Sequence, residues 1–471
     1  MTKKRIRDPI HGYIFLYPEE IEVIDTPYMQ RLRYIKQNGT TYLTYPSALH
    51  SRFEHSLGTM KVAGDIIRTL NSKYGSLWKQ EYKDENICNT LEKLARSIAL
   101  IHDTGHLMFS HAGEKALEEQ TEKLPKELQK FQKADFALHE MITAYLMKNT
   151  DLLERMKVDP NTAFNIFCSK DVNGLPWKVL SNLIRSQLDA DKLDYFLRDG
   201  YFTGVEFGKI DIQRIISDLE VKKDALNRDV LCLSHRSISA AETLIMERYK
   251  LYRWVYLHHK VVLTDELINR VIYYAIEGDL LTFETVEDIL FRENNAGGLV
   301  YITDDYVIHK VNSAEQNNNS IKMSKKYLKM LLERKLPKPL WKNLVERKEV
   351  LQELLGKFSG ICANFQKRIE LEDKIYDKLK SKFKNNFSRE EIVIPYKKFD
   401  VYKLAVEAEE EIRISFDDKV EPLSDIRPVV KDIKHRAREE ALYAYICLPT
   451  SLINNYRKDC INIVLKAVDE I

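Results

Sequence analysis

An apolar helical segment, residues 94–101, leads directly into the dipeptide His102-Asp103. Apolar side chains recur within the segment at helical spacing, which predicts a buried helix, and Gly105 is the expected stop signal. An imidazole and a carboxylate are therefore held side by side where a buried helix reaches the surface. Such a pair can bind a metal ion through one nitrogen and one oxygen. Two further ligands would complete the site.

A chain of 471 residues is too long for one compact core. Helical periodicity dominates between residues 19 and 280, and the last forty residues are again helical in character. We expect a mostly α protein, with a helical domain over residues 1–310 and a smaller α+β region over residues 320–471. We expect a turn leading into a short strand over residues 7–18, strands at 230–233, 392–395 and 411–416, and a loop at 171–176.

The composition excludes several classes of protein. With 44% hydrophobic and 31% charged residues, the chain is typical of soluble globular proteins. A formal charge of +2 argues against extensive nucleic-acid coating, although a local basic pocket stays open. The chain has no signal-peptide pattern, no apolar run long enough for a membrane span and no Cys-x-x-Cys, so we expect a reduced, cytoplasmic protein. The lysines and arginines between residues 322 and 338 are more typical of a solvated helix face than of nucleotide or nucleic-acid contact.

Two other motifs offer the missing ligands. His55 lies upstream in RFEHSLG (52–58), and Asp191 lies downstream in DADKLDYFLRDG (189–200). A single histidine is more often structural than ligating, so the interpretation depends on the whole set. A His, a His-Asp pair and a distant Asp resemble the ligand set of the HD superfamily of metal-dependent phosphohydrolases. This resemblance implies that one metal is bound by His55, His102, Asp103 and Asp191.

The resemblance extends well beyond the four ligands. Six segments occur in the order found in the deoxynucleoside triphosphate (dNTP) triphosphohydrolase branch of that superfamily: DPIHG (8–12), IDTP (24–27), QRLRYIKQ (30–37), RFEHSLG (52–58), HDTGH (102–106) and DKLDYF (191–196). It covers residues 4–258, whereas the C-terminal third carries no motif that aligns. The resemblance implies an HD helical core and hydrolysis of dNTPs to deoxynucleoside and inorganic triphosphate.

Attack of water on the α-phosphorus of a triphosphate requires control of a high negative charge. A cation neutralises the phosphate and lowers the pKa of a bound water. Two imidazoles and two carboxylates suit iron, manganese, cobalt, nickel or zinc without selecting one, and magnesium is expected with the triphosphate. Electrostatics and positioning dominate this chemistry, so cationic and hydroxyl side chains should surround the phosphates.

The resemblance also assigns the substrate contacts. Gln37 and Asp199 are expected to face the sugar, where Asp199 holds the 3′-hydroxyl and close packing by Tyr256 excludes a 2′-hydroxyl. Arg248 and Tyr256 are eight residues apart, which places both near one helix face. The alternative is an aromatic-rich helix that packs the core, with its arginines reaching solvent. The phosphate contacts are expected to be Arg52, Lys192, Tyr195, Arg248 and Tyr256.

Three histidines near the predicted metal are candidates for the acid that protonates the leaving 5′-oxygen. The resemblance assigns this role mainly to His111, with His106 and His139 assisting. For His139 a core position is a comparable alternative. Glu114 stands where the vertebrate member of this dNTP triphosphohydrolase branch has the shorter Asp, which leaves open whether Glu114 still orients His111.

The family resemblance implies regulation by a second nucleotide at a subunit junction. We therefore expect a homo-oligomer, either a dimer or a tetramer. The expected activator is a guanine nucleotide, because Asp25 and Arg33 suit the edge of a guanine base. The alternative is that Asp25 caps a helix beginning at Thr26-Pro27 while Arg33 makes a surface ion pair. The matching positions are Lys4, Asp25, Gln30 and Arg33.

Two other functions stay open. The chain could be another HD phosphohydrolase or phosphodiesterase, acting on a different nucleotide or on single-stranded DNA, although a 3′-hydroxyl contact at Asp199 argues against internal strand cleavage. It could also be a non-catalytic nucleotide sensor, although a pure sensor has no need of His106 and His111.

Overall fold

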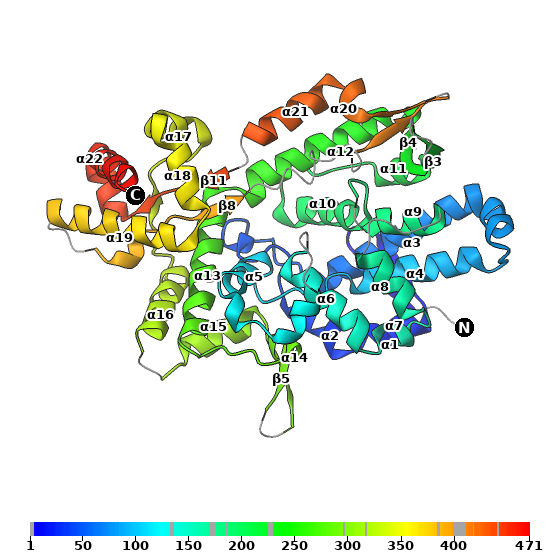
Figure 1. Ribbon diagram of the computed structural model, residues 1–471, viewed down its shortest axis with the longest axis horizontal. Helices are drawn as coiled ribbons and strands as arrows, with labels where there is room; N and C mark the ends of the chain where they lie inside the picture. Colours follow the sequence, from blue (N-terminus) through cyan, green and yellow to red (C-terminus); the bar gives the residue numbers. More distant parts are fainter. Residues whose placement is uncertain are drawn as a thin grey trace.

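Helices dominate the fold, which confirms the mostly α prediction (Figure 1). The strands are short and form small sheets of two or four strands. No helix in the part of the chain that is described has the length and apolarity needed to cross a membrane. The computed structural model describes residues 4–131, 136–168, 175–184, 186–224, 229–294, 297–315, 318–383, 387–398, 411–417, 419–439 and 442–471.

The N-terminal part begins with a β-hairpin that pairs Arg7 with Tyr13. Two strands therefore stand where the sequence predicted a turn and one strand. The elements of this part are β1 (Lys4–Asp8), β2 (Gly12–Leu16), α1 (Pro18–Ile24), α2 (Pro27–Gln30), α3 (Arg52–Tyr82), α4 (Ile87–Ile101), α5 (His111–Glu118), α6 (Leu138–Asn149), α7 (Leu152–Arg155), α8 (Pro160–Cys168), α9 (Leu175–Ile184) and α10 (Ala190–Thr203).

Local capping fixes where the two helices at the centre of this part begin. The Glu54 carboxylate accepts a hydrogen bond from the backbone N–H of Ser51 at 3.0 Å, which starts α3. The Asp189 carboxylate accepts from the backbone N–H of Lys192 at 2.7 Å, which starts α10. Helix α3 packs along α4 and contacts α10. The caps therefore set the positions of the first turns of α3 and α10.

The remaining chain combines helices with short strands. Its first elements are α11 (Ile212–Ser217), β3 (Leu219–Lys223), β4 (Asp229–Ser234), α12 (Ile238–Leu251), α13 (His259–Glu277), α14 (Val286–Leu290), β5 (Phe291–Glu293), β6 (Leu299–Tyr301), α15 (Asp304–Asn312) and α16 (Asn319–Leu332). The later ones are β7 (Lys338–Pro339), α17 (Leu344–Leu351), α18 (Leu355–Cys362), α19 (Phe365–Lys382), β8 (Tyr396–Lys398), β9 (Arg413–Ser415), β10 (Val420–Pro422), α20 (Leu423–Ile426), α21 (Pro428–Glu439), β11 (Leu442–Ala444), β12 (Cys447–Leu448) and α22 (Thr450–Asp469).

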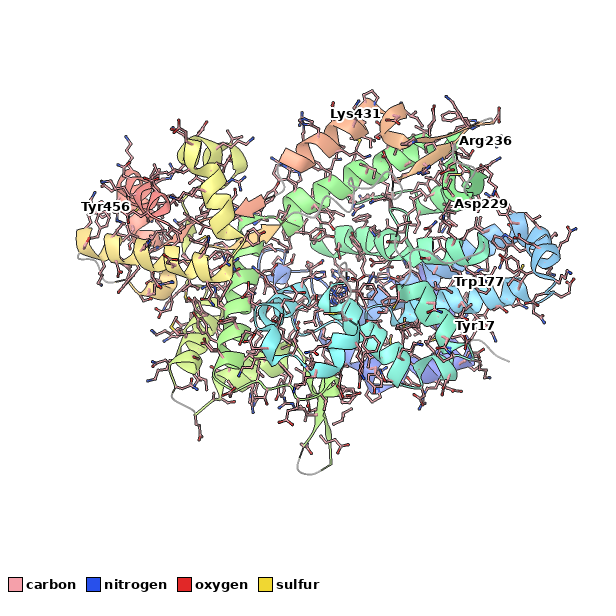
Figure 2. The ribbon with its side chains drawn as sticks, in the orientation of Figure 1. Tyr17, Trp177, Asp229, Arg236, Lys431 and Tyr456 are labelled. Carbon is pink, nitrogen blue, oxygen red and sulfur yellow. The ribbon has the colours of Figure 1, made fainter. Side chains whose placement is uncertain are left out.

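The C-terminal region is divided between two ends of the molecule. Strand β9 pairs in parallel with β4, with Ile414 opposite Leu233, and this builds the four-stranded sheet β10-β9-β4-β3. Helix α21 contacts α12 on that side, whereas α17, α18, α19 and α22 gather at the other end (Figure 1). Lys431 on α21 and Tyr456 on α22 mark the two parts in Figure 2. The domain boundary near residues 310–320 stays a prediction.

A network of buried charges joins the C-terminal part to α5 and α13. Lys115 of α5 pairs with Glu266 of α13 at 2.9 Å, and Glu266 also pairs with Arg270 at 2.9 Å. Arg270 in turn pairs with Glu372 of α19 at 2.9 Å. Arg368 of α19 completes the network, with its guanidinium 3.4 Å from Glu266.

Of the other local predictions, some are confirmed and some are wrong. The strand predicted at 230–233 is confirmed within β4, and the one at 411–416 is confirmed as β9. The strand predicted at 392–395 is wrong, because only Val393 makes an isolated bridge there and β8 begins at Tyr396. The last forty residues are not helical throughout, since β11 and β12 precede α22. Of the loop predicted at 171–176, residues 171–174 lie outside the described ranges, and the prediction is wrong for Leu175 and Pro176, which begin α9.

The basic residues between 322 and 338 lie mainly on the exposed side of α16 and in the loop after it. Lys326 pairs with Glu390 at 2.6 Å, and Lys335 pairs with Glu333 at 2.7 Å. These contacts agree with a solvated face.

Gly105 permits a close helix contact and is not the stop of α4, as the sequence had suggested. Helix α4 ends at Ile101, and Gly105 does not have a positive φ. A Cβ atom on Gly105 would lie 2.1 Å from the carbonyl oxygen of His139 and 2.6 Å from the backbone nitrogen of Thr143. The loop after His102 can therefore touch the backbone of α6 only because residue 105 lacks a side chain.

Substituting Gly105→Ala should reduce the free energy of unfolding by about 1–3 kcal/mol, the usual cost of overpacking, because α6 or the loop must move. Urea denaturation measures this change. Gly356→Ala is the matched control, because a Cβ there meets nothing within 4 Å on helix α18, and alanine should leave stability equal or slightly higher. A Gly105→Ala protein as stable as the wild type would contradict the role given to this contact.

Candidate active site

Three helix ends converge on one point, and each carries a predicted metal ligand. His55 lies in the first turn of α3, His102 follows the last turn of α4, and Asp191 lies in the first turn of α10. The Nε2 atom of His55 is 2.9 Å from Asp191 Oδ1, and that of His102 is 3.7 Å from the same oxygen. Asp103 lies beside both rings, 3.1 Å from His102 Nε2 and 3.6 Å from His55 Nε2. The four side chains therefore border one small volume.

The Nδ1 atoms of His55 and His102 make hydrogen bonds that leave both Nε2 atoms available to a metal. His55 Nδ1 is 2.8 Å from the Asp194 carboxylate, and His102 Nδ1 is 2.7 Å from the carbonyl oxygen of Ala99. An Nδ1–H donated to these oxygens leaves a lone pair on each Nε2. The buried Nε2 of His102 has no hydrogen-bond partner among the described residues. Two such nitrogens with two carboxylates fit a divalent transition metal.

The carboxylates favour positive charge at this point. Burial by itself lowers the pKa of His55, but hydrogen bonds to Asp191 and Asp194 outweigh burial and raise the pKa to about 10. Burial would raise the pKa of Asp103, but the charges of His102 and Arg52 hold it well below its usual range. The ionised carboxylates thus stabilise a cation, whether a metal ion or a proton.

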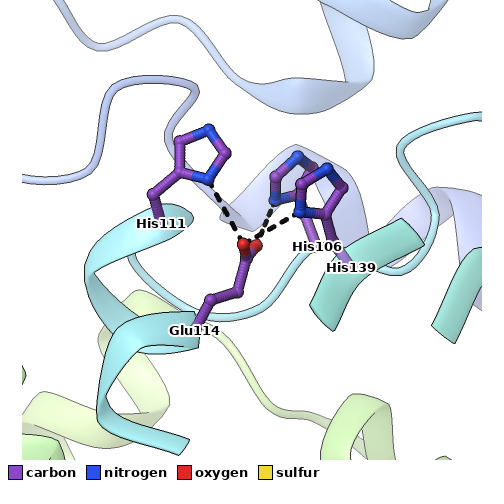
Figure 3. Close-up of side chains that lie close together, drawn as sticks. All are labelled: His106, His111, Glu114 and His139. Carbon is purple, nitrogen blue, oxygen red and sulfur yellow. Dashed lines mark hydrogen bonds and ion pairs between the residues drawn. The ribbon is translucent and has the colours of Figure 1, made fainter. Parts of the chain in front are cut away.

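A second cluster gathers three imidazoles around one buried carboxylate (Figure 3). The carboxylate belongs to Glu114 of α5, and its Oε2 atom is 2.9 Å from His139 Nδ1 and 3.2 Å from His111 Nδ1. His106 Nδ1 bonds the other oxygen, and its ring stacks on His139 with 3.8 Å between centroids. Glu114 therefore contacts His111 despite being longer than the aspartate expected there, and His139 belongs to this cluster.

The imidazoles of the second cluster differ in charge. Burial, together with the charge of Arg52, lowers the pKa of His106 to about 4. Burial also lowers the pKa of His139, but Glu114 outweighs it and the net shift is upward. A ring that gives up its proton easily thus lies against one that holds its proton more strongly than usual. His106 Nε2 is 3.4 Å from Asp103 Oδ1, so the two clusters share an edge.

Buried polar contacts hold the loop between the clusters. Arg31 donates from Nη2 to two carbonyl oxygens in residues 104–106, at 2.9 and 2.7 Å. Phe109 and Ser110 then adopt φ angles of 57° and 54°, and such conformations cost non-glycine residues about 1–3 kcal/mol each. Arg52 donates to Ser110 Oγ at 2.8 Å and also pairs with Asp103. The strained turn projects His111, whose side chain is 67% exposed.

The residues expected at the sugar lie together. Both carboxylate oxygens of Asp199 accept hydrogen bonds, Oδ2 from the Tyr256 hydroxyl and Oδ1 from His50 Nε2 at 2.7 Å. The backbone N–H of Gln37 donates to the carbonyl oxygen of His50 at 3.0 Å. The structure therefore brings Gln37, Asp199 and Tyr256 together around His50.

Arg248 and Tyr256 are related through a change of helix type. Helix α12 ends at Leu251, and residues 252–256 form a π-helical turn, a feature frequent at functional sites. The argument from eight-residue spacing on one regular helix was therefore wrong, although Tyr256 still reaches Asp199. Arg248 is buried and donates to Gln187 Oε1 at 2.6 Å.

Lys192 and Tyr195 project from the first two turns of α10. The Lys192 ammonium pairs with Asp189, the residue that caps the same helix. The Tyr195 ring lies 6.4 Å from the His55 ring, between centroids, and its hydroxyl lies 3.5 Å from that of Tyr252. Burial raises the pKa of Tyr195 well above its usual range, so the hydroxyl keeps its proton and can donate to a phosphate oxygen.

The positions expected at a regulatory nucleotide lie near the N-terminus. Lys4 and Asp25 are exposed, and Arg33 donates to Gln30 Oε1 at 2.9 Å. Thr26, not Asp25, occupies the N-cap position of α2, so the capping alternative is wrong. Arg33 makes no ion pair among the described residues and instead lies over the ring of Phe53 at 3.6 Å.

Sequence reasoning missed four residues that support the site: His11, Arg31, His50 and Asp194. His11 Nε2 is hydrogen bonded to Oδ1 of Asp194 at 2.6 Å, whereas His55 contacts Oδ2 of the same carboxylate. His11, Arg31 and Asp194 lie inside the motifs that carry the family resemblance, and this position could have marked them as residues of the site. Nothing in the local sequence shows that residues so far apart in the chain pair with one another.

Comparisons with known proteins agree with this geometry. Residues 52–194 match the HD domain family. The chain is 28% identical to an uncharacterized protein, MJ1154, of Methanocaldococcus jannaschii, over 99% of this chain and 84% of that protein. It is 30% identical to the human deoxynucleoside triphosphate triphosphohydrolase SAMHD1, over 59% of this chain and only 46% of that protein.

A solved structure shares the fold of nearly the whole chain. It is a hypothetical protein from Aquifex aeolicus, with a TM-score of 0.67 and 21% sequence identity, and the match covers 98% of this chain and 100% of that one. The match of residues 52–194, together with the converging histidines and aspartates, identifies an HD domain within this chain.

Proposed function

We propose that the protein hydrolyses dNTPs to deoxynucleoside and inorganic triphosphate. The observation that carries this proposal is that Asp103 is shared between the cluster of metal ligands and the imidazole cluster on Glu114, with 3.4 Å from its Oδ1 to His106 Nε2. A hydrolytic centre and a proton source are thus adjacent. The similarity to deoxynucleoside triphosphate triphosphohydrolases of vertebrates supports the substrate class.

In the proposed reaction each group has a defined task. A divalent transition metal held by the first cluster would neutralise phosphate charge and supply a nucleophile near neutral pH. Arg52, Lys192 and Arg248 bind phosphate oxygens by charge. His111 donates its proton to the leaving 5′-oxygen, and the stacked pair of His106 and His139 assists through the shared Glu114 carboxylate.

The sugar is selected by hydrogen bonding and by space. Asp199 accepts the 3′-hydroxyl, and Tyr256, which is hydrogen bonded to Asp199, occupies the space that a 2′-hydroxyl would need. We also propose that a guanine nucleotide, bound near Asp25 and Arg33, promotes a homo-oligomer. Gel filtration and turnover that are both unchanged by GTP or dGTP would contradict the activator.

The purified protein, incubated with each dNTP and with magnesium and one added transition metal, should release inorganic triphosphate and the deoxynucleoside. Chromatography of the products measures this. Release of a monophosphate would instead indicate a phosphodiesterase or another phosphohydrolase, and tight nucleotide binding without turnover would indicate a sensor.

His102→Ala should remove one nitrogen ligand, so that the protein retains much less than one metal per chain and loses turnover. Elemental analysis of the purified protein measures the metal. His309→Ala, on the exposed side of α15, is the control and should keep both metal and activity. Equal metal contents in the two variants would rule out His102 as a ligand.

Glu114→Gln should move the alkaline limb of the kcat profile to lower pH. Glu114 raises the pKa of His139, so removing its charge lets that assisting ring lose its proton at lower pH, and proton donation through His111 then loses its support. Steady-state rates across a pH series measure the limb. A limb that stays in place would show that the acid does not depend on this carboxylate.

A further inference from the structure

His50 joins the two residues expected to face the sugar. Its side-chain Nε2 bonds Asp199 at 2.7 Å, while its backbone carbonyl accepts from the N–H of Gln37 at 3.0 Å. The isolated bridge between Lys36 and Ser51 holds the two chain segments in this register. One residue therefore fixes both the position of Gln37 and the orientation of the Asp199 carboxylate.

The His50 ring is enclosed and immobilised. Its side chain has no solvent exposure, and it stacks on Phe202 with 4.7 Å between centroids and 18° between planes. Asp199 is itself buried, and its second oxygen accepts from Tyr256. An ionised carboxylate can only accept, so the Asp199 contact places a proton on His50 Nε2.

Asp199 and Gln37 both retain hydrogen-bond acceptor capacity that no residue in the described part of the chain uses. A carboxylate has about four lone-pair directions, and two protein donors leave the others for a ligand hydroxyl. Gln37 Oε1 is buried and has no hydrogen-bond partner among the described residues. Buried acceptors without partners are rare in proteins, so a hydroxyl donor supplied by a ligand would complete them.

We propose that His50 is a positioning residue that sets discrimination for a 3′-hydroxyl on the substrate sugar. It acts by holding Asp199 against Tyr256, so that the free lone pairs of the carboxylate face the hydroxyl. A sugar without that hydroxyl leaves the Asp199 acceptor unpaired, and sites built around such a hydrogen bond reject the analogue. This inference rests on the proposed function, because it takes Asp199 to face the sugar of a dNTP.

The test compares His50→Phe with His50→Gln on two substrates, a dNTP and the corresponding 2′,3′-dideoxynucleotide. Phenylalanine keeps the stack on Phe202 but cannot donate, whereas the amide nitrogen of glutamine can replace Nε2. In His50→Phe, kcat/KM for the dNTP should fall roughly 10- to 100-fold, as expected for a lost hydrogen bond to a charged group, while that for the dideoxynucleotide changes less than about threefold. His50→Gln should restore most of the preference.

Phe202→Leu is the control, since it removes the stack and keeps the hydrogen bond. Any loss of kcat/KM in this variant should be equal for the dNTP and the dideoxynucleotide, so that the ratio of the two kcat/KM values is preserved. A His50→Phe protein that keeps the wild-type ratio, or that loses both activities equally, would overturn the inference while leaving the proposed function intact. A wild-type protein that hydrolyses neither nucleotide would overturn the proposed function and this inference with it.

Discussion

The site depends on the contacts that one buried carboxylate, that of Asp103, makes with its neighbours. Its Oδ1 lies 3.1 Å from His102 Nε2 and 3.4 Å from His106 Nε2, and its Oδ2 pairs with Arg52. One group thus borders the metal ligands, the imidazole cluster and a cation expected at the phosphates. A charge added at any of these three places changes the electrostatic energy of the other two, because the shared carboxylate is buried. The proposed metal binding and the proposed proton donation would therefore be coupled through it.

Buried supports keep that carboxylate in place. Asp194 fixes the His55 ring from behind, Arg31 binds the backbone of the loop after His102, and Gly105 lets the same loop touch α6. Each support is a contact between segments distant in the chain. The left-handed turn at Phe109 persists because its N–H donates to the buried Asp304 carboxylate at 2.6 Å. The geometry is held by surroundings that compensate its strain.

These contacts also explain how far the sequence could lead. Helical periodicity was sufficient for the mostly α fold, because it is a local pattern, whereas the residues that gather at the site were indicated by the family resemblance of the ordered motifs. The pairing of β9 with β4, the π-helical turn at residues 252–256 and the bond from His50 to Asp199 depend on tertiary packing. Gly105 was misread for the same reason, since its neighbour is α6 and not its own helix.

The C-terminal third, which carries no recognisable motif, has a physical task in this arrangement. Lys115 directly follows Glu114 on α5 and is tied through Glu266 and Arg270 to Glu372 of α19. Such pairs add little net stability, but removing one partner leaves a buried charge unpaired at a cost of about 3–5 kcal/mol. Moving α19 away from α13 would leave such a charge unpaired next to α5, the helix that carries Glu114. The network therefore holds α5 against the C-terminal part and, with it, holds Glu114 in place relative to His106 and His139, which lie outside that helix.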